Sequence, residues 1–194
     1  MRSVLLALNR VTRGVELVES PEAVSTCDRV VLPGVGHFAT YLQSLAARGF
    51  SLEALRRIAQ TQQTLAICVG MQILGLASEE APGVPGLGLV DCEVKHLSNL
   101  GESPSHVPHL GWSRIELATS LAPSGSLLAI QDRDVYFMHS YAVPGHCAGT
   151  LATCNEGGRF AAVIRGATAT GVQFHPERSQ AAGLDFLREW VRET

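Results

Sequence analysis

The sequence predicts an α/β fold: an open mixed sheet, mainly parallel, with helices on both of its faces. Helical and strand-like segments alternate through the first half of the 194 residues, while strand-like segments separated by turns dominate the second half. Alternation of helix and strand is typical of parallel sheets covered on both faces. Closely spaced strands with Gly, Pro and Ser turns indicate antiparallel pairing. We therefore expect a parallel part and an antiparallel part.

In the first half, apolar residues recur at helical spacing in three segments, and short apolar runs mark the strands between them. The expected helices span 2–11, 38–48 and 52–60, and the expected strands span 15–18, 29–32 and 65–68. The last of these strands ends at Gly70, where a new helical pattern begins.

The second half carries strand-like segments separated by turns such as Pro82-Gly83 and Pro144-Gly145, and it ends in a helical pattern. The expected strands lie near 90–97, 112–117, 135–138, 150–153, 160–164 and 171–174, and the closing helix near 180–192. Neither an internal repeat nor a low-complexity linker marks a boundary, so residues 1–194 are predicted to form a single domain.

Composition narrows the classes of function. A net charge of −3 and a pI near 6.1 leave no basic surplus for nucleic acid, and no apolar run reaches the length of a membrane span. We expect a soluble cytoplasmic protein. The five cysteines contain no C-x-x-C pair and the histidines lack ligand spacing, so neither a disulfide framework nor a metal or other cofactor is expected.

A candidate nucleophile stands where the strand over 65–68 gives way to helix. Ala66 and Gly70 place small residues two before and two after Cys68, which is the strand-turn-helix pattern of a nucleophile elbow. The start of a helix also stabilises a thiolate. A buried core cysteine is the alternative interpretation of this segment taken alone.

A candidate base follows at the end of another strand. In the segment 171–177, His175 is followed by a proline and then by Glu177. A cysteine that attacks an amide needs a base that later protonates the leaving ammonia, and a carboxylate that orients this base. Cys68, His175 and Glu177 supply these three roles.

With these pieces in view, the sequence resembles the class I glutamine amidotransferases, which have a flavodoxin-like sheet. Among them it is most similar to the glutaminase subunits of imidazole glycerol phosphate synthases. The His-Pro-Glu ending over 175–177 is shared by the whole class. The segments that single out this subunit lie over 32–38, 108–112 and 138–141, in the family's order along nearly the whole chain.

The resemblance also assigns an oxyanion hole and a substrate site. It implies oxyanion donors from the backbone of Val35 and Val69, with Gly34 and Gly36 giving the turn its conformational freedom. The resemblance also implies that three residues contact the substrate glutamine: Gln72, Ser140 and Tyr141. A simple strand-to-helix turn over 33–36 is the alternative.

Four departures from the family pattern stand out. Ala66 and Val69 replace glycine and leucine beside the cysteine, Ser113 stands where asparagine is common, and Arg178 replaces a lysine after His-Pro-Glu. Arg178 keeps its charge but changes the geometry of any ion pair with a partner. Trp112 could belong to the core or to an interface.

The family usually opens with a short strand and a Gly-rich loop, whereas here a helix starts at Arg2. We therefore expect the family's first strand to be missing, with Met1 as an internal methionine of a longer chain.

The resemblance implies a function and a partner. The chain would hydrolyse L-glutamine through a cysteinyl thioester and pass ammonia to a (β/α)8-barrel cyclase subunit, which makes imidazole glycerol phosphate and an aminoimidazole carboxamide ribotide for histidine biosynthesis. The alternatives are the glutaminase subunit of anthranilate or aminodeoxychorismate synthase, and a catalytically silent interaction module.

Overall fold

The computed structural model describes residues 2–101, 106–118, 125–156 and 158–193, and at its centre is a six-stranded sheet in the order β1-β2-β10-β9-β8-β5. The three parallel strands are β1 (Arg29–Gly34), β2 (Gln63–Cys68) and β10 (Ala169–Val172). Antiparallel pairing then adds β9 (Arg159–Gly166), β8 (Thr150–Asn155) and β5 (Glu116–Leu117). The predicted mixed sheet is confirmed, and its parallel strands gather on one side.

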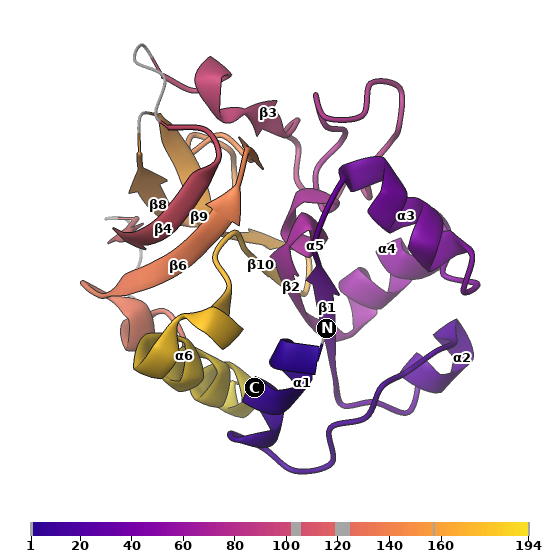
Figure 1. Ribbon diagram of the computed structural model, residues 1–194. Helices are drawn as coiled ribbons and strands as arrows, with labels where there is room; N and C mark the ends of the chain where they lie inside the picture. The colour runs from indigo at the N-terminus through magenta and orange to yellow at the C-terminus, as the bar shows by residue number, and fades with distance from the viewer. Residues whose placement is uncertain (1, 102–105, 119–124, 157, 194) are drawn as a thin grey trace.

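Helices cover the parallel strands. Figure 1 shows α3 (Phe38–Ala46) and α4 (Leu52–Thr61) on one side of β1 and β2, and α1 (Arg2–Asn9) together with α6 (Gln180–Arg192) on the other. The buried residues of α4 are Leu55, Ile58 and Ala59, whose spacing of three and four places them on one helix face. The helices expected over 2–11, 38–48, 52–60 and 180–192 are all present, with ends shifted by at most two residues.

Two small antiparallel sheets complete the second half. β4 (His109–Arg114) pairs with β6 (Asp134–His139), and β3 (Lys95–His96) pairs with β7 (Tyr141–Ala142). The remaining helical elements are short: α2 (Pro21–Val24), α5 (Val69–Gln72) and the 3-10 turns η1 (Leu97–Asn99), η2 (Leu128–Ile130) and η3 (Pro176–Arg178). No helix in the described ranges has the length and apolar character that crossing a bilayer requires.

Two expected strands are wrong. Residues 15–18 form no strand, and of the segment 90–97 only the two residues of β3 do. A strand exists only where a neighbouring backbone completes its ladder. In the described part of the sheet β1 is the edge strand, with β2 as its one neighbour, and residues 15–18 do not pair with its open edge. Short apolar runs in the sequence do not show whether such a neighbour is available.

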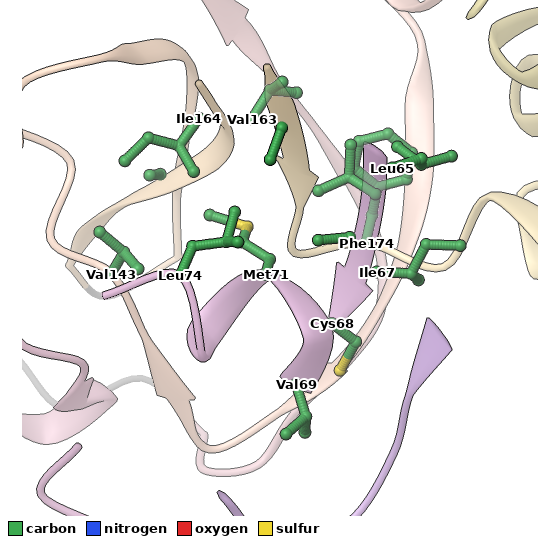
Figure 2. Packing of buried hydrophobic residues seen from close by; sticks show 14 of the residues in the cluster. Leu65, Ile67, Cys68, Val69, Met71, Leu74, Val143, Val163, Ile164 and Phe174 are labelled. Carbon is green, nitrogen blue, oxygen red and sulfur yellow. The ribbon is translucent and has the colours of Figure 1, made fainter. Parts of the chain in front are cut away.

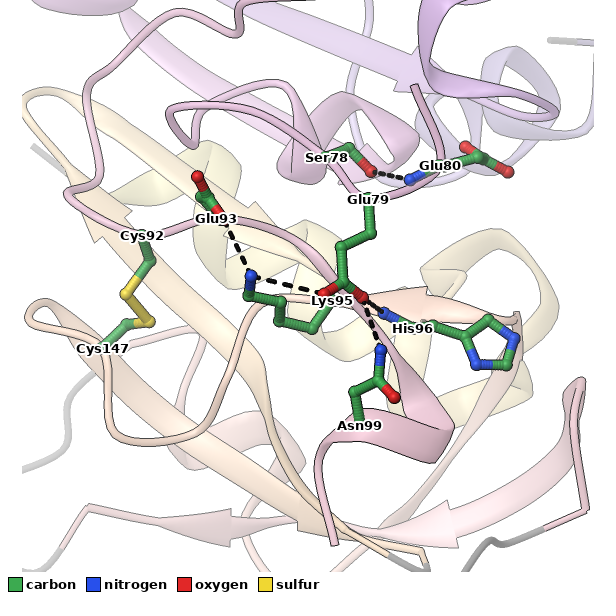
Figure 3. A network of polar contacts seen from close by, with 9 residues as sticks. All are labelled: Ser78, Glu79, Glu80, Cys92, Glu93, Lys95, His96, Asn99 and Cys147. Atoms are coloured by element: carbon green, nitrogen blue, oxygen red, sulfur yellow. Dashed lines mark hydrogen bonds and ion pairs between the residues drawn. A yellow bond between two sulfur atoms is a disulfide. The ribbon is translucent and has the colours of Figure 1, made fainter. Parts of the chain in front are cut away.

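The cysteines also correct the sequence prediction, because Cys92 and Cys147 form a disulfide, with their Cα atoms 6.1 Å apart. Figure 3 shows this bond close to a polar network in which Glu79 binds Lys95 and the backbone N–H of His96. The two cysteines are 55 residues apart and lie in separate loops. Their spacing in the sequence therefore did not indicate a disulfide. The two cysteines come together only in the folded chain.

Candidate active site

The turn after β2 holds Cys68 in an unusual backbone conformation. Cys68 has φ 55° and ψ −112°, and Figure 2 shows it at the junction of β2 and α5, next to Val69. Positive φ is strained for a residue with a side chain, and strain of this kind is retained where the surroundings enforce it. The strand-turn-helix that the sequence predicted around Cys68 is present, although α5 spans only four residues.

The small residues around the elbow are required by close backbone packing. A Cβ on Gly70 would collide with the carbonyl oxygen of Leu32, and a Cβ on Gly34 would collide with the backbone N of Gly70. Gly34 is the register partner of Cys68 in the β1–β2 pair. The turn after β1 and the elbow after β2 can therefore approach each other only because Gly34 and Gly70 lack side chains.

The imidazole of His175 is oriented by Glu177. His175 Nδ1 lies 2.9 Å from Glu177 Oε1, and both side chains are buried. Burial by itself would lower the pKa of His175, but the nearby side chains of Cys68 and Glu177 raise this pKa to about 9. His175 Nε2 is buried and has no hydrogen-bond partner among the described residues.

Backbone contacts fix the position of this histidine. The His175 N–H donates to the Tyr136 carbonyl at 2.8 Å, and the His175 carbonyl accepts from Ser179 Oγ at 2.7 Å. Ser179 in turn accepts from the Tyr136 N–H. These bonds to β6 therefore hold the segment that follows β10. The proline at 176 then starts η3 directly after His175.

A pocket opens at the ends of the parallel strands, in front of Cys68. Ligands of open α/β sheets bind at this edge. The residues that line the pocket come from the two turns, from α5, from β6 and from the loops that follow: Val35, Gly36, Cys68, Val69, Gln72, Glu80, Met138, His139, Ser140 and Tyr141. Of the residues expected in the site, Gly34, His175 and Glu177 are not part of this lining.

The turn after β1 forms one wall of the pocket. Val35 is 61% exposed, although it is apolar, and Gly36 has φ +92°. This conformation favours glycine. His37 closes the turn by accepting the Ala39 N–H at the start of α3. Val35 and Gly36 of this turn line the pocket.

Gln72 lines the pocket, as expected, and its side chain is also bonded to the pocket wall. The Gln72 side chain is buried, and its Nε2 donates to the Tyr141 carbonyl at 2.8 Å and to Gln173 Oε1 at 3.2 Å. Ser140 and Tyr141 line the pocket as expected, and the Ser140 carbonyl accepts from the Leu97 N–H. The amide nitrogen of Gln72 therefore holds the pocket wall in place.

The match to known proteins agrees with this geometry. The family model described as "Glutamine amidotransferase class-I" matches residues 3–193. "Imidazole glycerol phosphate synthase subunit HisH" of Acinetobacter baylyi is 36% identical over 192 residues, covering 98% of this chain and 92% of that protein. The protein of the same name from Zymomonas mobilis is 38% identical over 98% of this chain and 90% of its own length.

This chain belongs to the class I glutamine amidotransferases, in the family of the HisH subunits.

Solved structures extend the likeness in fold. A glutamine amidotransferase crystal structure superposes with a TM-score of 0.70 at 16% identity, covering 99% of this chain and 94% of the other. The crystal structure of a Thermoplasma acidophilum protein described as part of a GMP synthase gives 0.68 at 15% identity, with coverages of 98% and 85%. At such low identity the two comparisons show that the amidotransferase fold is shared.

Two residues near Cys68 or in the pocket were missed in the sequence. Gln173 is fully buried, and its Nε2 lies 3.7 Å from Cys68 Sγ. Glu80 lines the pocket, and its carboxylate accepts the Phe38 N–H at 2.7 Å. A polar residue inside the apolar run before His175 was a usable signal for Gln173. Glu80 lies in a loop, where an acidic residue by itself indicates nothing.

Proposed function

We propose that this protein is the glutaminase subunit of an imidazole glycerol phosphate synthase and that Cys68, His175 and Glu177 are its catalytic residues. The observation that supports this most strongly is the strained Cys68 elbow beside a buried His175–Glu177 pair. It is supported further by relatives that carry this synthase's name along nearly the whole chain.

The proposed reaction begins with attack of the Cys68 thiolate on the side-chain carboxamide carbon of glutamine. The C–N bond then breaks as imidazolium His175 transfers its proton to the amide nitrogen, which departs as ammonia and leaves a glutamyl thioester on the sulfur. Neutral His175 next removes a proton from water, which attacks the thioester and releases glutamate. Glu177 keeps the imidazole in one orientation and stabilises its charged form.

Backbone N–H groups of Val35 and Val69 are the proposed oxyanion donors. Val69 is the first residue of α5, where the N–H groups have no partner within the helix. Val35 follows β1 in the turn that Gly36 permits, and both residues line the pocket. Two donors on opposite turns could bind an oxygen that becomes negative above the sulfur.

The substrate's amino-acid end would be bound by the loops around the pocket. Glu80 is the acidic residue in the lining, and we assign it to the α-ammonium group of glutamine. Backbone groups of Ser140 and Tyr141 form the opposite wall and would bind the α-carboxylate side. A zwitterionic amino acid fits a pocket that offers both kinds of contact.

We propose that a cyclase subunit docks over the outer face of β4 and β6. Leu110 and Trp112 are 60% and 45% exposed there. The Trp112 ring meets Tyr136 edge-on at 5.7 Å, and the Arg178 guanidinium lies 5.9 Å from the Tyr136 ring centre. An aromatic anchor beside an arginine is typical of interfaces. Because Tyr136 also binds the His175 N–H, this face adjoins the active site.

We also propose that this protein and its cyclase are cytoplasmic. The function is tested by measuring glutamine hydrolysis with the purified chain alone and with its cyclase. We expect low activity alone and a marked increase in the complex, because a glycine turn such as 34–36 can occupy more than one backbone state and a partner can favour one. An inactive complex would support the silent-module alternative. Activation by anthranilate or aminodeoxychorismate synthase instead would assign another pathway.

A further inference from the structure

A chain of polar side chains runs from the wall of the glutamine pocket to the surface. His139 Nδ1 lies 3.0 Å from the Tyr141 carbonyl oxygen, and His139 Nε2 lies 3.3 Å from His109 Nδ1. His109 Nε2 is 2.9 Å from Ser113 Oγ, which is 2.9 Å from Glu156 Oε1. The catalytic groups proposed above use none of these four side chains. The chain joins an exposed carboxylate to the backbone of the pocket.

The two histidines occupy an aromatic environment that offers few other partners. They are register partners in the β4–β6 pair, and each is less than 10% exposed. His109 stacks on Phe137 at 4.8 Å, and His139 meets Phe160 edge-on at the same distance. Buried polar groups without hydrogen bonds are costly, so each imidazole depends on the partners within this chain.

The hydrogen positions on His139 and His109 follow from the pocket end of this chain. The Tyr141 carbonyl can only accept, so His139 must carry hydrogen on Nδ1. Burial, together with the charges of neighbouring histidines, lowers the pKa of His139 to about 3, so this ring is neutral and its Nε2 accepts. His109 must therefore donate from Nδ1. His109 therefore donates to His139, and His139 donates to the Tyr141 carbonyl.

Ser113 connects His109 to the surface. The Ser113 hydroxyl donates its one hydrogen to Glu156 Oε1, and its oxygen lies 2.9 Å from His109 Nε2. Burial lowers the pKa of His109, although the charge of Glu156 opposes this effect. Glu156 is exposed, so the outer end of the chain is in contact with solvent. Ser113 stands where the family commonly has asparagine.

We propose that His139 and His109 are positioning residues, which fix the Tyr141 carbonyl and with it the glutamine-binding wall through hydrogen bonds directed from His109 to His139 and from His139 to the carbonyl. The Tyr141 carbonyl has a second donor, Gln72 Nε2 at 2.8 Å, so two buried side chains hold one backbone oxygen. This inference rests on the proposed function, because it assigns Tyr141 to glutamine binding.

The chain should govern binding more than chemistry. His139 touches the wall at Tyr141, while the proton transfers are assigned to His175 on another strand. Loss of the His139 donor removes one buried hydrogen bond, so we expect His139→Phe to raise the KM for glutamine about tenfold. The kcat of the complex should remain within about twofold of wild type, because the bond is present in ground and transition states alike.

Two substitutions of His109 separate a directed chain from simple packing. In an asparagine the amide nitrogen can take the place of Nδ1, whereas in a glutamine it reaches the place of Nε2. His109→Asn can still donate to His139, and His109→Gln can bind Ser113 but not His139. We expect the KM of the Asn variant to stay within about threefold of wild type and that of the Gln variant to rise about tenfold. Glu116→Gln, an exposed change on β5, serves as the control with unchanged KM.

Nitrogen-15 NMR of the histidine rings provides a readout that does not depend on activity. We expect His139 in the Nδ1–H form in the wild-type chain and in His109→Asn. A wild-type His139 in the Nε2–H form would overturn the inference, as would equal KM values for the two His109 variants. If wild type with its cyclase does not hydrolyse glutamine, the proposed function fails, while the NMR result still tests the direction of the chain.

Discussion

The parallel and antiparallel halves of the molecule contribute to the pocket in different ways. The parallel strands carry the proposed catalytic groups at their C-terminal ends: the 34–36 turn at the end of β1, Cys68 at the end of β2, and His175 just beyond β10. The antiparallel half delivers a wall, made of backbone at 138–141 that buried side chains hold in place. Reactive groups are therefore set by short local motifs, whereas the shape of the site depends on contacts between residues distant in sequence.

The largest expected effect comes from removing the nucleophile of the parallel half. Cys68→Ala should lower glutamine hydrolysis by the complex about 10⁴-fold or more, because the thioester cannot form. Synthesis from added ammonia should persist, since ammonia enters after that step. Both rates are measured on the same preparation of the complex.

Cys154 in the antiparallel half is the matched control. It is a buried free cysteine on β8, and burial, with the nearby charge of Glu156, raises the pKa of its thiol to about 12. Cys154→Ala should keep the hydrolysis rate. If Cys154→Ala were as inactive as Cys68→Ala, the division of roles between the halves would be wrong.

A second test removes the disulfide between the loop at Cys92 and the turn at Cys147. The bond closes a long loop, so its loss in a Cys92→Ser, Cys147→Ser double variant should lower the free energy of unfolding by about 4 kcal/mol. Urea unfolding without reductant measures this difference. With a thiol reductant, wild type and variant should become nearly equal. Equal stability under oxidising conditions would show that the bond does not form in solution.

The third test concerns the close approach of β1 and the elbow. Gly70→Ala places a Cβ against the Leu32 carbonyl oxygen and should lower the free energy of unfolding by about 3 kcal/mol. Gly14→Ala is the comparison, because Gly14 has φ +72° but no atom within 4 Å of an added Cβ. Only backbone strain acts there, and a loss of about 1 kcal/mol is expected. Thermal and urea unfolding of both variants measure the two losses. Equal losses would show that the close contact with Leu32 does not destabilise the Gly70→Ala variant.

The smallest effect is a shift in pH dependence. With the pKa of His175 raised to about 9, imidazolium is available to protonate the leaving ammonia below that pH, so kcat/KM should fall as pH rises through it. Glu177→Gln removes a charge that favours imidazolium, so the alkaline limb should move to lower pH. A profile that moves to higher pH, or stays in place, would contradict the role given to Glu177.

The same comparison explains what the sequence could predict. The elbow at Cys68 and the His175–Glu177 pair are encoded by neighbouring residues, so their local geometry follows from short stretches of sequence. The helices were predictable for the same reason, since their apolar spacing is local.

The rest depends on contacts between distant residues. The disulfide, the histidine pair of β4 and β6 and the Gln72 bond to Tyr141 each join residues at least 30 positions apart. Residues 15–18 resembled a strand in isolation and form none, because pairing needs a neighbour that no short segment can specify.

The central claim is that Cys68 is the nucleophile, and the most direct test is covalent labelling by an electrophilic glutamine analogue, such as its chloroketone. The complex is incubated with the analogue, digested, and the labelled cysteine is identified by mass spectrometry. Cys27 and Cys154, the other free cysteines of the described residues, serve as internal controls. We predict one label per chain, on Cys68, and protection by excess glutamine. A label on Cys27 or Cys154, or no label in a complex that hydrolyses glutamine, would contradict the assignment.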